Sequence, residues 1–258
     1  AKPSNTPALY SLMNYADMSL GTWYPMGGMS KVIDGMVLLA TSLGVRFEYN
    51  SNIQRVDLNS TKAKGIVVND KFQSFDYVVA SADYHHVEQD LLPASHRRYS
   101  EQYWQKRVMA PSSLIFYLGV NKKIDHLLHH TLFFDEDFTR HAEQIYDQPQ
   151  WPTAPQFYVS CPSKTDPSVA PEGHENIFIL IPVAPGLTDE ETTRERYFEM
   201  VISRLERLIG QNIRNHIVFK RSYAHRDFVQ DYNAFKGNAY GLANTLMQTA
   251  NLKPSILN

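Results

Sequence analysis

Apolar residues recur with helical spacing in two long stretches of the chain. Within residues 29–43 they return every three or four residues, and Gly44 follows where a helix would end in the left-handed conformation. A second apolar stripe follows Thr188 and Glu191, whose spacing matches a capping box, and it stops at Gly210. The pattern therefore predicts two amphipathic helices, one ending near Gly44 and the other near Gly210.

Alternating apolar positions and β-branched residues predict strands between and after these helices. The predicted strands cover residues 45–49, 53–58, 65–68, 77–80, 112–120, 156–160, 176–183 and 217–223. Shorter helices are expected over residues 8–16, 85–92 and 95–109, and residues 121–154 are expected to form a loop. Because helices and strands follow one another along the whole chain, the expected fold class is α+β or α/β.

Length and composition fit an ordinary globular protein. The 258 residues are 43% hydrophobic and 20% charged, which allows one large domain or two small ones. The formal net charge of -2 provides no basic field, so no nucleic-acid partner is expected. The single cysteine, Cys161, excludes an internal disulfide and a thiolate metal cluster, and a reducing compartment is the default expectation.

The two ends of the chain suggest a piece of a longer protein. The sequence has no initiating methionine, no secretory leader and no element that visibly finishes at residues 254–258. It also contains no run of 18 apolar residues, so no membrane-spanning helix is predicted. We therefore expect an excised segment that does not cross a membrane.

Aromatic residues are unusually frequent in this chain. It has 15 Tyr, 13 Phe and 3 Trp, which together make 12% of the residues. Such a set can fill a core that has tyrosines on its rim, or it can line a large tunnel for an apolar ligand. Composition alone leaves both interpretations open.

Most motifs with a well-defined chemistry are excluded. The paired glycines at positions 27 and 28 open onto a helix, where backbone amides could approach a flat or anionic group, although an ordinary tight turn has the same pattern. No Gly-Lys-Ser/Thr follows them, and no Gly-x-Gly-x-x-Gly occurs anywhere in the chain. His126, His129 and His130 lack the Glu and Cys partners of a zinc site, so no metal is expected.

Four segments carry a more specific pattern. They are residues 21–29 (Gly-Thr-Trp-Tyr-Pro-Met-Gly-Gly-Met), 52–56 (Asn-Ile-x-x-Val), 78–83 (Val-Val-Ala-Ser-Ala-Asp) and 232–242 (Tyr-Asn-Ala-Phe-Lys-Gly-Asn-Ala-Tyr-Gly-Leu), the last followed by Gln248 and Lys253-Pro254. In order and spacing they resemble the carotenoid desaturase family, the phytoene desaturase (dehydrogenase) type of flavoproteins. Two positions depart from that family: Ser81 stands where Asn is usual, and Lys253 stands where Arg is more frequent.

This resemblance implies a fold and a division into domains. It implies a partial FAD-binding domain of the Rossmann-like, amine oxidase type, and a substrate domain whose mixed β-sheet is covered by helices. The N-terminal dinucleotide motif and the C-terminal flavin motif of the family are absent, so a central fragment is expected. The expected division is a lead-in to the substrate domain at 1–22, FAD binding at 23–93, substrate binding at 94–232, and a return to the FAD-binding domain at 233–258.

The resemblance also implies an activity. It is FAD-dependent desaturation of a carotenoid precursor such as phytoene in carotenoid biosynthesis, with hydride transfer from an allylic C–H bond to the flavin. FAD is expected in the intact protein, whereas this fragment is expected to bind it weakly or not at all and to be inactive. Two other interpretations stay open: a related flavoprotein of the amine oxidase or retinoid saturase type, and a lipid or carotenoid carrier without a cofactor.

Site residues follow from the same segments. The expected cofactor contacts are Pro25, Gly27, Gly28, Met29, Ile53, Ala82, Asp83 and Gly241. The expected substrate contacts are Tyr24, Tyr232, Phe235 and Tyr240. Asp231 and His225 are the titratable groups nearest to the last segment, but neither is assigned as the catalytic proton acceptor. If one cofactor joins these segments, Gly27, Ile53 and Tyr240 should lie around a shared crevice.

A long apolar polyene dissolved in lipid implies peripheral membrane contact and a cytoplasmic, membrane-associated location. The helix expected over residues 95–109 is a candidate for this contact, because Tyr99, Tyr103 and Trp104 combine there with basic residues at positions 106 and 107. An ordinary surface helix packed on a sheet explains the same residues. The oligomeric state is not predicted.

Overall fold

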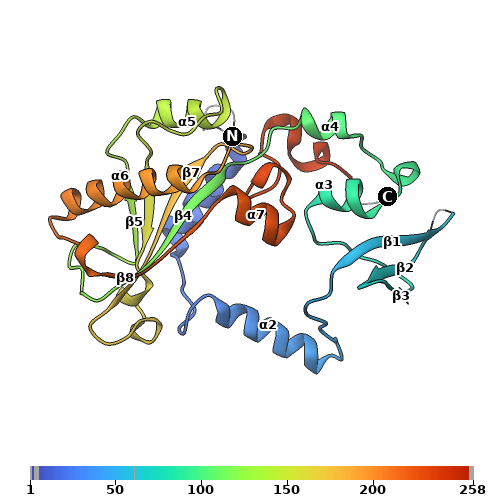
Figure 1. The fold of residues 1–258 in the computed structure, drawn as a ribbon, viewed down its shortest axis with the longest axis horizontal. Coiled ribbons are helices and arrows are strands. Elements are labelled where there is room, and N and C mark those ends of the chain that lie inside the picture. Colours follow the sequence, from blue (N-terminus) through green and yellow to red (C-terminus); the bar gives the residue numbers. More distant parts are fainter. Residues whose placement is uncertain (1, 3–5, 61, 256–258) are drawn as a thin grey trace.

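The computed structural model describes residue 2 and residues 6–60 and 62–255, and it contains two β-sheets (Figure 1). The smaller sheet has the order β1-β2-β3, and the larger one has the order β5-β6-β7-β4-β8. Sheets and helices together confirm the predicted fold class. All strand pairs are antiparallel, so the mixed pairing predicted for the larger sheet is not found in the described residues. The ranges 1–22 and 233–258 extend in part beyond the described residues, and the domain boundaries stay predictions.

The elements have the following bounds. The strands are β1 Ile53–Asn59, β2 Lys62–Val68, β3 Lys71–Ser74, β4 Ser112–Val120, β5 His130–Phe133, β6 Phe157–Ser160, β7 Glu175–Val183 and β8 Ile217–Tyr223. The α-helices are α1 Ser11–Tyr15, α2 Ser30–Ser42, α3 Tyr84–His86, α4 Glu101–Gln105, α5 Phe138–Tyr146, α6 Glu191–Ile209 and α7 His225–Tyr232. Short helical turns extend α1 to residues 8–20 and α3 to residues 84–91.

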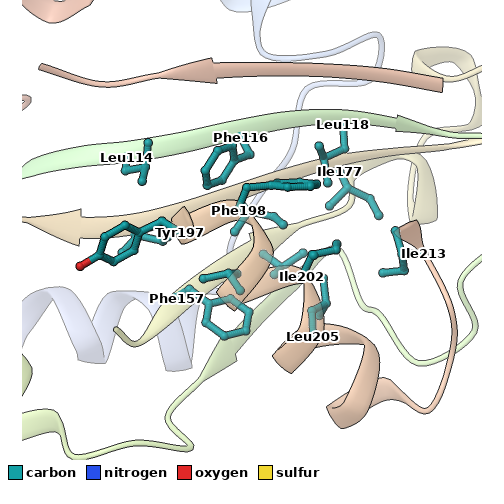
Figure 2. Close-up of a cluster of buried hydrophobic side chains, with 14 of the residues drawn as sticks. Leu114, Phe116, Leu118, Phe157, Ile177, Tyr197, Phe198, Ile202, Leu205 and Ile213 are labelled. Carbon is teal, nitrogen blue, oxygen red and sulfur yellow. The ribbon is translucent and has the colours of Figure 1, made fainter. Parts of the chain in front are cut away.

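The core lies between α6 and one face of the five-stranded sheet. Alternate residues of β7, beginning with Ile177, point into it, because successive side chains of a strand face opposite sides. The apolar stripe of α6 meets them, and Phe198 packs edge-on against Phe116 of β4 at 5.3 Å (Figure 2). Burying each such side chain stabilises the fold by roughly 1.5–3 kcal/mol. This packing holds the larger sheet together.

A buried ion-pair network anchors the start of α6. Asp189 accepts hydrogen bonds from Arg194 Nε (2.7 Å) and Nη2 (2.6 Å), and the same Nη2 also reaches Asp227 (2.7 Å). Burial alone would raise the pKa of Asp189, but these hydrogen bonds hold it below its ordinary value. The predicted capping box is wrong, because the helix begins at Glu191 with no side-chain cap.

Two predicted strands, at residues 45–49 and 77–80, are wrong. Both segments are without strand structure, and neither pairs with another segment of the described chain. Most of their apolar side chains are exposed, and Val79 is 93% exposed. A strand needs a hydrogen-bonded neighbour, and none of the described residues provides one here.

Two further predictions, for residues 95–109 and 121–154, are wrong. The loop predicted for residues 121–154 contains β5 and α5, whose short lengths hid their periodicity. The helix predicted for residues 95–109 is reduced to α4, and Trp104 is only 2% exposed, packed between Tyr84 and Tyr103. Its indole is therefore unavailable to a lipid surface. Among the described helices, none is both long and apolar enough to cross a membrane.

Two buried histidines should make the stability of this fold depend on pH. His141 donates from Nε2 to Pro182 O (2.8 Å) and accepts at Nδ1 from Gln156 N (3.1 Å), while His225 donates from Nε2 to Ala184 O (2.7 Å). Burial lowers the pKa of both rings. A folded-state pKa below the unfolded value of about 6.5 gives a contribution that is present above that pH and is lost as the pH falls below it.

We therefore expect urea titrations to show a falling free energy of unfolding from about pH 7 to about pH 5. The His141→Gln variant should show a shallower fall, because glutamine does not take up a proton there. The exposed His126 provides the control, and His126→Gln should keep the wild-type slope. Equal slopes in all three proteins would contradict this assignment.

Candidate functional site

A cavity of about 600 Å³ forms where three distant parts of the chain meet. It is lined by Asp83, Tyr84, His85, Trp104, Met109, Ala110, Pro111, Phe235, Tyr240, Gly241, Leu242, Ala243, Asn244, Lys253 and Pro254. The walls are mostly apolar and aromatic, which is typical of sites for small apolar ligands. Four of the predicted site residues are among them: Asp83, Phe235, Tyr240 and Gly241.

Asp83 joins two walls of this cavity. Its Oδ1 accepts hydrogen bonds from His85 N (3.0 Å) and His86 N (3.3 Å), which caps α3. Its Oδ2 accepts from Phe235 N (3.2 Å), more than a hundred residues further along the chain. Both oxygens are thus engaged by the chain itself, which gives Asp83 a positioning role, and its predicted contact with the cofactor stays a prediction.

Stacked rings form the aromatic wall. His85 lies parallel to Phe235 with ring centroids 4.0 Å apart, and Trp104 meets Tyr84 edge-on at 5.1 Å. Ring pairs at these separations add roughly 0.5–1.5 kcal/mol beyond the area that they bury. The sequence did not single out His85 or Trp104 for this site, because their contacts come from segments far apart in the chain.

Backbone pairing with the C-terminal block completes the cavity. Ala110 N donates to Gly241 O (2.8 Å), and Ala243 N donates to Val108 O (2.9 Å). The side chain of Gln248 holds this short ladder, because it accepts from Val108 N (3.0 Å) and donates to Val108 O (2.8 Å) and Ala243 O (3.1 Å). Gln248, which follows the fourth segment of the family resemblance, therefore has a structural role: it joins two backbone segments.

Gly237 lets α7 approach the cavity closely. Its φ is +60°, and a Cβ at this position would lie 2.9 Å from the Cα and Cβ of His225. Only glycine tolerates both the left-handed conformation and this approach. The turn that carries Phe235 can therefore pack directly against the first residue of α7.

The predicted glycine loop lies elsewhere, at the start of α2. Gly27 and Gly28 have φ values of +91° and +100°, and Gly27 N donates to Asp166 Oδ2. No side chain caps the start of α2, and its first amides donate to the backbone instead: Lys31 N to Gly28 O (3.0 Å) and Val32 N to Met29 O (3.2 Å). The two glycines carry no side chain, so a flat ring could approach their backbone, although none of these residues lines the cavity.

A buried carboxylate supports the turn that receives this loop. Glu175 accepts from Lys164 Nζ (2.8 Å) and from the Ser163 hydroxyl, which anchors the segment leading to Asp166. Cys161 lies beside Glu175, and burial raises the pKa of its thiol to about 11. The single cysteine is therefore a packed core residue and a poor nucleophile.

The structure thus brings together some of the predicted residues and separates others. Outside the cavity lie Tyr24, Pro25, Gly27, Gly28, Met29, Ile53, Ala82 and Tyr232. Ile53 begins β1 and pairs with Val68. The crevice expected to join Gly27, Ile53 and Tyr240 is not found among the described residues, and the contact roles of these residues stay predictions.

Neither titratable candidate reaches the cavity. Asp231 accepts from the Tyr223 hydroxyl (2.9 Å) on an exposed surface, and His225 is buried behind the wall. The structure therefore assigns the proton acceptor to neither residue. Within the described parts of the chain, no cluster of three or more His, Cys, Asp and Glu side chains could hold a metal ion.

Replacement of Asp83 by Ala should loosen the cavity. The variant removes the cap of α3 and the acceptor for Phe235 N, so we expect a loss of about 1–3 kcal/mol in the free energy of unfolding. Urea titration of the full-length protein measures it. Asp76→Ala, at an exposed position, is the control and should change stability by less than about 0.5 kcal/mol.

Alanine substitutions at two glycines with similar φ values distinguish the cost of a left-handed backbone from the cost of a steric clash. Gly237→Ala adds a clash with His225 to the cost of a left-handed alanine, whereas Gly173, with φ +73°, has open space around an added Cβ. We expect Gly173→Ala to cost about 1 kcal/mol and Gly237→Ala to cost about 1–3 kcal/mol more. Equal losses in thermal melting experiments would show that the clash is relieved without cost.

Comparison with known proteins agrees with the sequence motifs. A family model described as flavin containing amine oxidoreductase matches residues 1–258. The chain is 42% identical over 256 residues to the carotenoid 3,4-desaturase of Haloarcula japonica, covering 98% of this chain and 51% of that protein. It is 32% identical over 194 residues to the phytoene desaturase of Fusarium fujikuroi, covering 74% of this chain and 34% of that protein.

A solved structure supports the fold. An oxidoreductase from Methanosarcina mazei superposes with a TM-score of 0.61 at 15% identity, covering 84% of this chain and 47% of that one. The chain thus spans about half the length of the first of these relatives and of this structure. The resemblance to carotenoid desaturases is confirmed, and the chain belongs to the flavin containing amine oxidoreductase family.

Proposed function

We propose that the intact protein is an FAD-dependent carotenoid desaturase that acts on CH–CH groups of a long polyene such as phytoene. The observation that carries this proposal is the cavity, which is aromatic and whose single acidic lining residue, Asp83, is already engaged by backbone amides. A cationic amine would find no free carboxylate there. The 42% identity to a carotenoid 3,4-desaturase supports the same substrate class.

The residues of this chain would hold and desolvate the reactants. FAD, when bound, would supply the acceptor for the hydride removed from the allylic carbon, and a proton would be lost from the neighbouring carbon to complete the double bond. Gly27, Gly28 and Met29 would lie at the ring through their backbone, since the two glycines carry no side chain that would keep a flat group away. Ile53 would meet the adenine end, as the family resemblance implies. The stacked pair of His85 and Phe235 would keep water from the reacting carbons.

Recognition of such a substrate must come from apolar burial and shape. A hydrocarbon offers no hydrogen-bonding group, and each Å² of apolar surface removed from water contributes about 25 cal/mol. Aromatic faces also stabilise the positive charge that develops at an allylic carbon when hydride leaves. Phe235 and Tyr240 are placed in the cavity to supply such faces.

Peripheral association with a membrane belongs to the same proposal. A polyene is dissolved in lipid, so its enzyme must collect it there. Support comes from the exposed apolar side chains of the helical segment at residues 8–20, which include Leu12, Met13 and Met18. A membrane-associated, cytoplasmic location stays a prediction.

Expression of the full-length gene in bacteria that accumulate phytoene, and separately in bacteria that accumulate lycopene, tests the function. New double bonds should shift pigment absorption to longer wavelength, and liquid chromatography with mass spectrometry should show losses of two hydrogens. A Gly27→Val, Gly28→Val double variant is the control and should lose bound flavin and pigment change together. Flavin-dependent oxidation of amines without any carotenoid product would sink the proposal.

A further inference from the structure

The five-stranded sheet has a second face that α6 does not cover. On β4, Phe116 and Leu118 point into the core, whereas Tyr117 between them is 40% exposed. The same alternation leaves Phe178 of β7 and Tyr158 of β6 half-buried on the opposite side from the core. This side of the sheet therefore carries several aromatic rings, with Arg221 of β8 opposite Tyr117, where a solvated face would be mainly polar.

These rings contact one another in strand order. Tyr117 lies 5.4 Å from Phe178, Phe178 lies 6.2 Å from Tyr158, and Tyr158 lies 5.9 Å from His130 of β5. The four strands are neighbours in the order β4, β7, β6 and β5. With strands spaced 4.7–4.9 Å apart, the rings extend across the sheet for about 14 Å.

Both ends of this series reach residues that the sequence singled out as substrate contacts. At one end His130 stacks on His129 at 4.3 Å, and His129 meets the ring of Tyr24, in the glycine loop, at 4.6 Å. At the other end Tyr232 of α7 is close enough to Tyr117 to help burial raise the pKa of that tyrosine. We call the seven side chains the ring row: Tyr24, His129, His130, Tyr158, Phe178, Tyr117 and Tyr232.

The ring row is continuous with the cavity through α7. That helix contacts β4 and β8 and runs directly into the turn that carries Phe235. Tyr232 is exposed at the last turn of this helix. An apolar chain that leaves the cavity along α7 would pass Tyr232, beside the hydrogen-bonded pair of Tyr223 and Asp231, before it reaches the sheet.

The row combines apolar ring faces with polar atoms, some of which are engaged within the chain. His130 Nδ1 is hydrogen-bonded to the Tyr158 hydroxyl, and His129 Nδ1 is hydrogen-bonded to Thr165 Oγ1 (2.8 Å). Leu132 of β5, at 62% exposure, adds to the same face beside Tyr158. An exposed apolar surface that is long and narrow matches a long, narrow apolar ligand.

We propose that the apolar chain of the polyene lies along the ring row, and that Tyr117 and Phe178 determine how far it advances past the reacting carbons. This inference rests on the proposed function and extends it from the cavity to the sheet. It makes the two middle rings specificity-determining residues: truncating them weakens polyene binding and changes how many double bonds are introduced.

Binding and product pattern test this inference in the full-length protein. Phosphatidylcholine vesicles with lycopene would be titrated against the protein, and quenching of its intrinsic fluorescence would be compared with that by lycopene-free vesicles. Tyr117→Ala and Phe178→Ala should each raise the half-saturating lycopene concentration about tenfold or more. In phytoene-accumulating cells they should also shift the products toward fewer double bonds.

Matched variants show whether the ring itself is responsible. Tyr117→Phe keeps the ring and should bind lycopene like wild type. Phe72→Ala, at a half-exposed aromatic residue of β3 outside the row, should also bind normally. Tyr117 is exposed enough for alanine to leave the fold intact, and equal melting temperatures and equal flavin absorbance would verify that.

Each outcome separates this inference from the proposed function. If wild type binds and desaturates the polyene and all variants behave alike, the ring row is not the binding surface while the function stands. Binding that depends on the row without any desaturation overturns the function and keeps the surface. If wild type neither binds nor converts a polyene, both fail. Lower melting temperatures with unchanged binding would show that another segment, such as residues 8–20, packs on this face.

Discussion

The packing of α6 against one face of the five-stranded sheet is the interaction on which the other features depend. Interdigitation of Phe198 with Phe116 and its neighbours fixes the twist and register of β4 and β7 (Figure 2). Because side chains alternate along a strand, filling one face with Ile177 and its partners forces Phe178 and Tyr117 to the other. The same strand, β4, leads back through Pro111 to Met109 in the cavity wall. The packing of α6 on the sheet therefore determines which residues enter the core, which reach the cavity wall and which lie on the opposite face of the sheet.

The cavity itself depends on a few polar side chains that join distant segments. Asp83 couples the start of α3 to Phe235, and Gln248 couples Val108 to Ala243. Each replaces hydrogen bonds to water by bonds within the chain, so losing one partner leaves buried amides unsatisfied. Asp83 and Gln248 thus hold the walls of the cavity in place, while its surface is mostly aromatic and apolar.

The many aromatic residues, whose role composition alone could not assign, fall into two groups. Phe116, Tyr197 and Phe198 fill the core, whereas Tyr117, Tyr158 and Phe178 lie on the uncovered face. The core interpretation offered by the sequence thus holds for the first group of rings, whereas the interpretation as a ligand tunnel stays a prediction for the second. Under the proposed function, the rings of this second group are the surface on which the polyene would lie.

The sequence by itself determined the family and the elements with strong local periodicity. It placed β4 and β8 at their observed bounds and α2 to within a residue of each end, since periodicity and glycine chemistry act over short range. It also predicted Asp83, Phe235, Tyr240 and Gly241 as site residues, and these four residues line the same cavity. Only the tertiary structure decided that Trp104 faces inward, that residues 45–49 and 77–80 lack strand partners, and that the glycine loop lies apart from the cavity. These outcomes depend on contacts between segments far apart in the chain, which no local pattern records.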